Sequence, residues 1–223
     1  MSRLPRAILF DLDGTLLDTA PDMVAALNAL RSERHLTALP FDGVRSFVSH
    51  GSARLVTLGF PDADPATSVA LQQRYLQIYG NALSRETKLF AGMEAVLAAI
   101  SRRGLSCGIV TNKPARLTTA LLDQLGLTPL FACVVSGDTV AERKPHPMPM
   151  LHAAALAGVA AADCLYVGDA ERDIQAAHAA GMRALVATYG YLRPDEDWRA
   201  WGAEGSIAQP DELLPWLDAG GRP

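Results

Sequence analysis

The sequence predicts an α/β protein: a doubly wound parallel sheet that carries a smaller all-helical insertion after its first strand. The opening apolar run, residues 7–10, is too short for a helix and suits a strand buried on both faces. From residue 92 onward, short apolar runs alternate with segments of helix length. This alternation indicates βαβ units, and hence parallel strands with helices on both faces of the sheet.

The insertion begins soon after the first strand. Pro21 marks the start of a helix that should run to about His35, because proline is favoured in the first turn. Residues 40–85 are typical of further helices, the longest at about 64–82, and no strand-like segment occurs between residues 18 and 88. We therefore expect a core domain formed by residues 1–17 and 86–223, and a helical domain formed by residues 18–85.

The remaining chain alternates between strands and helices. We expect strands at residues 107–110, 131–135, 165–167 and 184–187, and helices at residues 92–103, 114–125 and 171–180. Pro145, Pro147 and Pro149 crowd the predicted first turn of one more helix, where proline is tolerated. In the tail, residues 194–220, we expect two short helical pieces around an edge strand at 206–208.

Composition narrows the class of protein. The chain has 223 residues, of which 49% are hydrophobic and 20% charged, as in an ordinary globular protein. Its net charge of −4 argues against nucleic acid or an anionic membrane as a partner. An anionic substrate would therefore require a local positive site. No apolar run approaches membrane-spanning length, and the first one breaks at Asp11, too early for a secretion signal.

The three cysteines indicate a reducing compartment. Cys107, Cys133 and Cys164 lack a C-x-x-C spacing, and each lies in or beside an apolar run. They are typical of small buried thiols on strands. A chain with this cysteine usage and no targeting segment is expected in the cytoplasm, a reducing compartment.

Polar side chains follow four of the predicted strands, at the points where the strands end. They are Asp11 with Asp13, Thr111-Asn112-Lys113, Glu142-Arg143-Lys144, and Asp169 with Asp173. Taken singly, each cluster is ordinary turn chemistry or a solvated side chain. In a doubly wound sheet, however, ligands bind outside the carboxyl ends of the strands, which converge on one edge. The combination predicts one ligand site built from all four clusters.

These clusters also carry a family resemblance. The segment Asp11-Leu12-Asp13-Gly14-Thr15-Leu16-Leu17-Asp18-Thr19 resembles the first motif of the haloacid dehalogenase superfamily. Thr111, Lys144 and Gly168-Asp169-x-x-x-Asp173 match its other three motifs, in order and at typical spacing. The resemblance covers the whole chain and implies a Rossmann-like core with a helical cap.

Further segments resemble one subgroup of this superfamily. The helical insertion is similar to the small cap of phosphoglycolate-phosphatase-like enzymes, as are residues 140–147 and Tyr189-Gly190-Tyr191. Residues 194–197 and 201–203 resemble the N-acetylmuramic acid 6-phosphate phosphatases within that subgroup. The resemblance implies a Mg²⁺-dependent phosphomonoesterase that works through an aspartyl-phosphate.

Within that chemistry the paired aspartates have separate roles. Asp11 is the expected nucleophile, which splits one difficult step into two. Asp13 is expected to protonate the leaving alkoxide and then to take a proton from the attacking water. Asp11, Asp169 and the backbone carbonyl of Asp13 supply the hard oxygen ligands that suit Mg²⁺. Asp173 is expected to orient this group from behind rather than to bind the metal.

The phosphate group needs donors and positive charge around its oxygens. We expect Thr111, Lys144 and backbone amides after Asp11 to supply them, while Gly14 lets the backbone approach closely.

Five further residues lie near these motifs. Thr15 and Asn112 are assigned to substrate binding. Lys113 is left open between a contact with an aspartate or the substrate and simple solvation. Asp18 and Thr19 are interpreted as structural residues at the hinge into the insertion.

Substrate choice is expected to come from residues 45–54, where Gly51 interrupts two helices and a loop can approach the core. His50 and Arg54 would meet a substrate carboxylate, unless this segment is only a helical corner with solvated side chains. Phosphoglycolate and N-acetylmuramic acid 6-phosphate both carry a carboxylate. The expected partner is a small, carboxylated phosphate monoester. The oligomeric state, monomer or homodimer, is left open.

Two other functions stay open at this point. A sugar-phosphate mutase of the superfamily keeps the second aspartate but often has an apolar residue in place of Thr15, so a phosphatase is favoured. Dehalogenases and phosphonate-cleaving members lack that aspartate. A non-catalytic protein that binds a phosphate ligand would not need the complete set Asp11, Asp13, Lys144 and Asp169.

Overall fold

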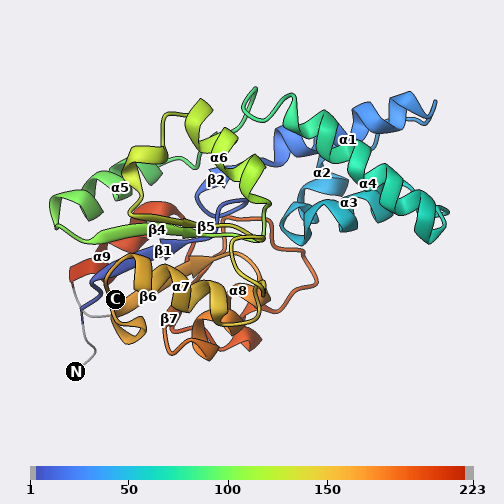
Figure 1. The fold of residues 1–223 in the computed structure, drawn as a ribbon. Coiled ribbons are helices and arrows are strands. Elements are labelled where there is room, and N and C mark those ends of the chain that lie inside the picture. The colour runs from blue at the N-terminus through green and yellow to red at the C-terminus, as the bar shows by residue number, and fades with distance from the viewer. Residues whose placement is uncertain (1–3, 219–223) are drawn as a thin grey trace.

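The computed structural model describes residues 4–218 and contains a six-stranded parallel sheet (Figure 1). Its strands are β1 (Ala7–Phe10), β4 (Ser106–Val110), β5 (Cys133–Val135), β6 (Cys164–Gly168), β7 (Arg183–Ala187) and β8 (Gly205–Ile207). They lie in the order β5-β4-β1-β6-β7-β8, and every neighbouring pair is parallel. The chain thus winds outward from β1 in one direction and then in the other, which confirms the predicted doubly wound sheet.

Helices cover both faces of the sheet, as the alternation along β1 requires. Ile8 and Phe10 pack in the core under α5 (Met93–Arg102), α6 (Ala115–Gln124) and α9 (Leu214–Asp218), whereas Ala7 and Leu9 pack in the core under α7 (Met148–Leu156) and α8 (Glu171–Ala179). All four side chains are fully buried. A strand with apolar residues on both faces is the physical basis of the short unbroken run in the sequence.

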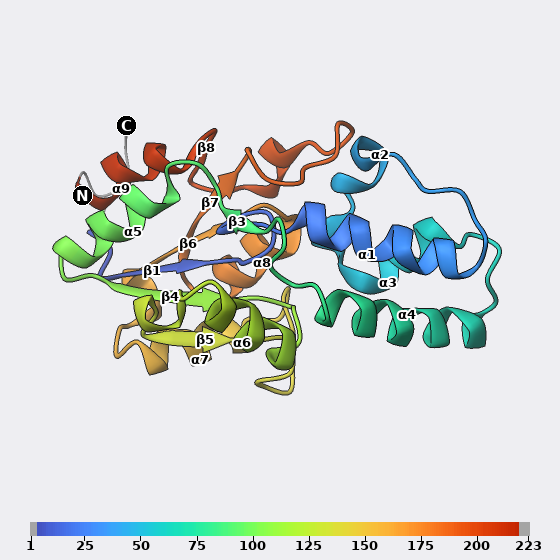
Figure 2. The same cartoon turned by 90° about the horizontal axis from the view of Figure 1, so that it is seen from above.

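Four helices form a separate group beyond the carboxyl ends of the strands (Figure 2). They are α1 (Ala20–Glu33), α2 (Phe41–Arg45), α3 (Gly51–Gly59) and α4 (Pro65–Gly80). We call this group the helical cap. Leu27, Leu55 and Tyr75 are among its fully buried side chains. The all-helical character expected for the insertion is confirmed, while its exact boundaries at residues 18 and 85 stay predictions.

Two short strands join the cap to the sheet and differ from our expectation. β2 (Leu17–Asp18) pairs antiparallel with β3 (Lys88–Leu89) where the chain leaves and re-enters the core. Sequence patterns missed them because two residues are too few to show an alternation. Beside this ribbon, the buried Asp22 carboxylate accepts hydrogen bonds from the backbone N–H groups of Glu86 and Thr87 and from the Thr87 hydroxyl.

The other expected strands and helices are present, with ends that lie within two residues of the prediction. One helix starts later than expected: α7 begins at Met148, so Pro145 and Pro147 precede it and only Pro149 lies in its first turn. Residues 1–3 and 219–223, which belong to the predicted core domain and tail, lie outside the described residues.

Two expectations about the chain's chemistry also have outcomes. The three cysteines are buried and unpaired on β4, β5 and β6, as predicted. Within residues 4–218, the helices are all too short or too polar to cross a membrane.

Candidate active site

The predicted clusters meet at the carboxyl edge of the sheet. Asp11 directly follows β1, Thr111 directly follows β4 and Asp169 directly follows β6. These three strands are neighbours in the order β4-β1-β6. The site therefore lies beside the strand from which the sheet is wound in both directions, the usual ligand position in such folds.

Lys144 is the fixed cation of the site. Its Nζ atom lies 2.9 Å from Asp11 Oδ1 and 2.7 Å from Asp173 Oδ1, with the lysine side chain fully buried. The same ammonium donates hydrogen bonds of 2.8 Å to the Val110 carbonyl and to the Tyr166 hydroxyl. A buried charge is tolerated only where it is paired and hydrogen-bonded. These contacts hold Lys144 beside the predicted nucleophile.

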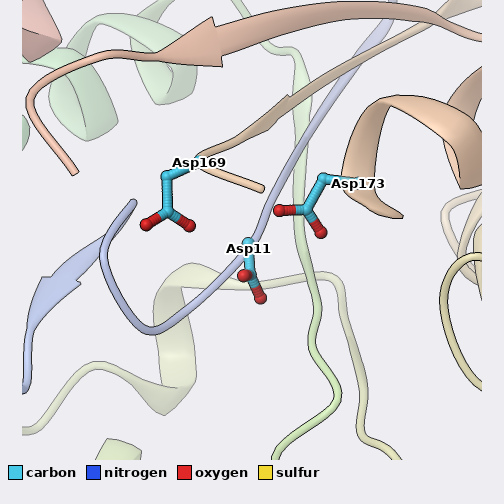
Figure 3. A group of neighbouring side chains, drawn as sticks. All are labelled: Asp11, Asp169 and Asp173. Carbon is cyan, nitrogen blue, oxygen red and sulfur yellow. The ribbon is translucent and has the colours of Figure 1, made fainter. Parts of the chain in front are cut away.

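Three carboxylates converge at this point (Figure 3). Oxygen atoms of Asp11, Asp169 and Asp173 all lie within 4.8 Å of one another, and all three residues are buried. Lys144 balances only part of their charge. Burial, together with the negative charges of Asp11 and Asp173, raises the pKa of Asp169 to about 7. A group of hard oxygen donors with excess negative charge fits a divalent cation such as Mg²⁺.

Asp169 is held from several sides. Its Oδ2 atom accepts hydrogen bonds from the Tyr191 backbone N–H at 2.9 Å and from the Ser49 hydroxyl at 2.7 Å. The Thr15 hydroxyl lies 3.4 Å from Oδ1. A Cβ atom at Gly14 would lie only 2.2 Å from Asp169 Oδ2, and Gly14 has a φ of 85°. Only glycine fits there, because the backbone passes close to Asp169; its approach to a phosphate stays a prediction.

Two residues assigned to substrate binding make hydrogen bonds within the protein. Thr15 is fully buried and directs its hydroxyl at Asp169 rather than into the cavity described below. Asn112 donates to the Lys144 carbonyl at 2.9 Å and accepts from the Lys144 backbone N–H at 3.0 Å. Asn112 thereby fixes the backbone of Lys144, and it also lines the cavity. Neither partner could be predicted from local sequence, because both lie far away along the chain.

Asp13 has a cationic partner of its own. Lys113 Nζ lies 2.9 Å from Asp13 Oδ1 and 3.2 Å from Oδ2, and the lysine is buried. The Thr19 hydroxyl donates to Oδ1 at 2.7 Å. Of the two interpretations left open for Lys113, the structure has the contact with an aspartate. Thr19, which was interpreted as a structural residue, contacts the site through this hydrogen bond.

A cavity of about 400 Å³ opens between the acid cluster and the helical cap. Asp11, Asp13 and Thr111 line it from the core side. His50 lines it from the cap, whereas Arg54 is exposed and its guanidinium lies 5.3 Å from the Phe47 ring centre instead. Arg54 was expected at the cavity but does not line it, because the helix that carries it turns this residue outward.

Several residues at the site carried no signal that we recognised. They are Ser49, Tyr79, Tyr166 and Arg172. Two clues were available: a tyrosine inside a buried strand needs a partner for its hydroxyl, and Arg172 lies between the two aspartates of the last motif. Ser49 lies in residues 45–54, the segment expected to approach the core, but its contact with Asp169 was not predicted. For Tyr79, also in the cap, the sequence held no such clue.

Fold and site together define a hydrolase class with paired aspartates after the first strand and a helical cap over them. The family model for haloacid dehalogenase-like hydrolases matches residues 8–187. This chain belongs to that family.

Similar proteins extend the comparison to the whole chain. A phosphoglycolate phosphatase of Xanthomonas campestris is 47% identical over 211 residues, which is 95% of this chain and 96% of the relative. An N-acetylmuramic acid 6-phosphate phosphatase of Pseudomonas putida is 38% identical over 217 residues and covers 96% of both chains. The crystal structure of a predicted phosphoglycolate phosphatase from Haemophilus somnus has a TM-score of 0.84 at 26% identity, over 94% of this chain and 96% of the other. The protein is a phosphoric monoester hydrolase of the phosphatase type.

Proposed function

We propose that this phosphatase is a Mg²⁺-dependent phosphomonoesterase in which Asp11 attacks phosphorus and forms an aspartyl-phosphate. The observation that carries the proposal is the buried contact of Lys144 with Asp11 at 2.9 Å, beside two further carboxylates. Asp11, Asp169 and the Asp13 carbonyl would hold the cation. When bound, it would screen the attack of one anion on another and polarise the phosphate. Lys144 and the cation would offset the negative charge that Asp11 brings to an anionic phosphate.

The chain's own groups account for the remaining chemistry. An Asp11 oxygen forms a bond to phosphorus while the bond from phosphorus to the leaving oxygen breaks. The carboxyl group of Asp13 gives its proton to that oxygen. Water then attacks the phosphorus of the aspartyl-phosphate and gives a proton to Asp13, which releases phosphate and restores Asp11. Thr111, Lys144 and backbone amides bind the phosphate oxygens, where charge stabilisation supplies most of the catalysis.

The proposed substrate is a carboxylated phosphate monoester. His50, Arg143 and Arg172 line the cavity and supply groups that a carboxylate can contact. The names of the two relatives support phosphoglycolate and N-acetylmuramic acid 6-phosphate. Phosphoglycolate is much smaller than a cavity of about 400 Å³, and this volume favours the sugar acid.

A phosphate-release assay over a panel of monoesters tests the proposal, with kcat/KM compared between these two acids. Release from either acid supports a phosphomonoesterase, and the larger kcat/KM identifies the better substrate. An isomerised sugar phosphate in place of free phosphate would indicate a mutase. No release from any substrate, including aryl phosphates, would indicate a binding protein and overturn the proposal.

A further inference from the structure

Lys113 is connected to the helical cap through a tyrosine. The lysine lies in the loop after β4, and its Nζ atom donates a hydrogen bond of 2.8 Å to the hydroxyl of Tyr79 in the last turn of α4. The ammonium also lies 4.6 Å from the centre of the Tyr79 ring. Both residues are buried. One ammonium group therefore bridges a cap tyrosine and the Asp13 carboxylate.

The Asp13 carboxylate is held asymmetrically. Oδ1 receives two hydrogen bonds, from Thr19 at 2.7 Å and from Lys113 at 2.9 Å. Oδ2 receives one longer hydrogen bond of 3.2 Å, also from Lys113. Rotation of the carboxylate would lengthen at least one of these contacts. Oδ2, the less engaged oxygen, keeps a lone pair that can carry a transferable proton, and Asp13 lines the cavity.

The geometry points to Tyr79 and Lys113 as positioning residues for the acid that protonates the leaving group. The Tyr79 oxygen fixes the ammonium of Lys113, and the ammonium fixes the plane of the Asp13 carboxyl group. This inference rests on the proposed function, in which Asp13 gives a proton from Oδ2 to the leaving oxygen as the bond from phosphorus to that oxygen breaks. Tyr79 and Lys113 transfer no proton themselves.

Tyr79 suits this role because its hydroxyl stays neutral. Burial, and after it the negative charges of Asp13 and Asp22, raises the pKa of Tyr79 well above its ordinary value. A neutral oxygen accepts a hydrogen bond from Lys113 without neutralising its charge, so the ammonium stays available to the carboxylate. The position of an acid matters because proton transfer needs hydrogen-bond reach to the leaving oxygen.

Aryl phosphates of graded leaving-group acidity separate positioning of the acid from general damage. p-Nitrophenolate is a good leaving group without protonation, whereas phenolate leaves poorly unless its oxygen is protonated. We expect Tyr79→Phe to lower kcat/KM for phenyl phosphate by about tenfold and for p-nitrophenyl phosphate by less than about twofold. Lys113→Met should make the loss of kcat/KM for phenyl phosphate, relative to p-nitrophenyl phosphate, larger still. Thermal unfolding and near-UV circular dichroism verify that each variant is folded.

Tyr75→Phe is the matched control. Tyr75 lies one turn earlier on α4, is equally buried, stacks on Tyr79 with ring centres 6.2 Å apart, and donates to the Met23 carbonyl instead. Tyr75→Phe should leave the ratio of kcat/KM between the two substrates at the wild-type value, whatever its overall rate.

Three results with the tyrosine variants, and a fourth with Lys113→Met, would overturn the inference. One is an equal loss on both substrates in Tyr79→Phe, another is no loss on either, and the third is the same selective loss on phenyl phosphate in Tyr75→Phe. If Lys113→Met raises KM without changing the ratio, Lys113 binds substrate and the inference fails. A wild-type protein that releases no phosphate from any aryl phosphate removes the proposed function and this inference with it. If the wild type is active but the ratio of kcat/KM between the two aryl phosphates is unchanged in the variants, only this inference fails.

Discussion

The hydroxyl of Ser49 donates a hydrogen bond of 2.7 Å to Oδ2 of Asp169. Ser49 lies in the short 3₁₀ turn of the helical cap at Val48–His50, and Asp169 directly follows β6 in the core. Arg172, in the first turn of α8, donates to the Ser49 carbonyl as well. The buried Ser49 thus joins the cap directly to the acid cluster.

Removal of this contact should weaken the docking of the cap. Ser49→Ala leaves a buried carboxylate with one donor fewer, which should lower the free energy of unfolding by about 1–2 kcal/mol. Urea denaturation measures this change. Ser46→Ala, three residues earlier and only half-buried, is the control and should change stability by less than about 0.5 kcal/mol. Equal effects of the two variants would contradict a specific role for the Ser49 hydroxyl.

Asp11→Asn should abolish turnover without unfolding the protein. The amide keeps the shape of the side chain but cannot attack phosphorus, so phosphate release should fall by at least about 1,000-fold. Circular dichroism would verify that the fold is retained. Asp42→Asn, on the exposed face of α2, is a matched control that should keep wild-type activity. Near-normal activity of Asp11→Asn would remove the nucleophile from the proposed mechanism.

Chelation of metal with EDTA should abolish phosphatase activity, and added Mg²⁺ should restore that activity. The cation would offset the excess negative charge of Asp11, Asp169 and Asp173, whose oxygens lie within 4.8 Å of one another. Mg²⁺ should therefore also raise the melting temperature of the chelated protein, because a ligand of the folded state stabilises it. This stabilisation should be lost in Asp169→Asn. Activity that persists in EDTA would instead indicate chemistry of the dehalogenase type.

The sequence predicted the core half of the site better than the cap half, for a physical reason. Asp11, Asp13 and Asp169 directly follow or closely trail buried strands, so the sheet topology alone brings them together. Lys113 was ambiguous because local sequence does not distinguish an exposed lysine from one buried against Asp13. The partners of Ser49 and Tyr79 depend on how the cap docks, which requires contacts between segments far apart in the chain.

Errors in the fold have a related cause. β2 and β3 are two residues each, and their pairing depends on the ends of an insertion meeting in space. Such a ribbon leaves no periodic pattern in the sequence. Arg54 was misplaced because helical spacing gives the direction of a side chain only when the orientation of its helix is known.

The link between the first cap helix and residues 86–87 should depend on Asp22. Its buried carboxylate accepts hydrogen bonds from two backbone N–H groups and from the Thr87 hydroxyl, the last at 2.7 Å. Asp22→Ala would leave these donors unsatisfied and should cost about 2–4 kcal/mol of stability, whereas Thr87→Val should cost about 1–2 kcal/mol. Denaturant unfolding of both variants and of the double variant gives their coupling. Simple additivity of the two losses would contradict a shared interaction.

His50 should make stability depend on pH. Partial burial of its ring, with a side chain 30% exposed, lowers its pKa from 6.5, and the positive charge of Arg172 adds to this effect. The unfolded chain then binds a proton near pH 6.5 while the folded protein does not. The stability contributed by His50 is therefore fully present above pH 6.5 and is lost as the pH falls through the lower folded-state pKa. NMR titration of the His50 ring should give a midpoint below 6.5, and His50→Gln should flatten the dependence of the unfolding free energy on pH in this window. A midpoint at or above 6.5 would show that the ring is solvated or is dominated by its contact with Glu196, whose Oε1 lies 3.5 Å from His50 Nε2.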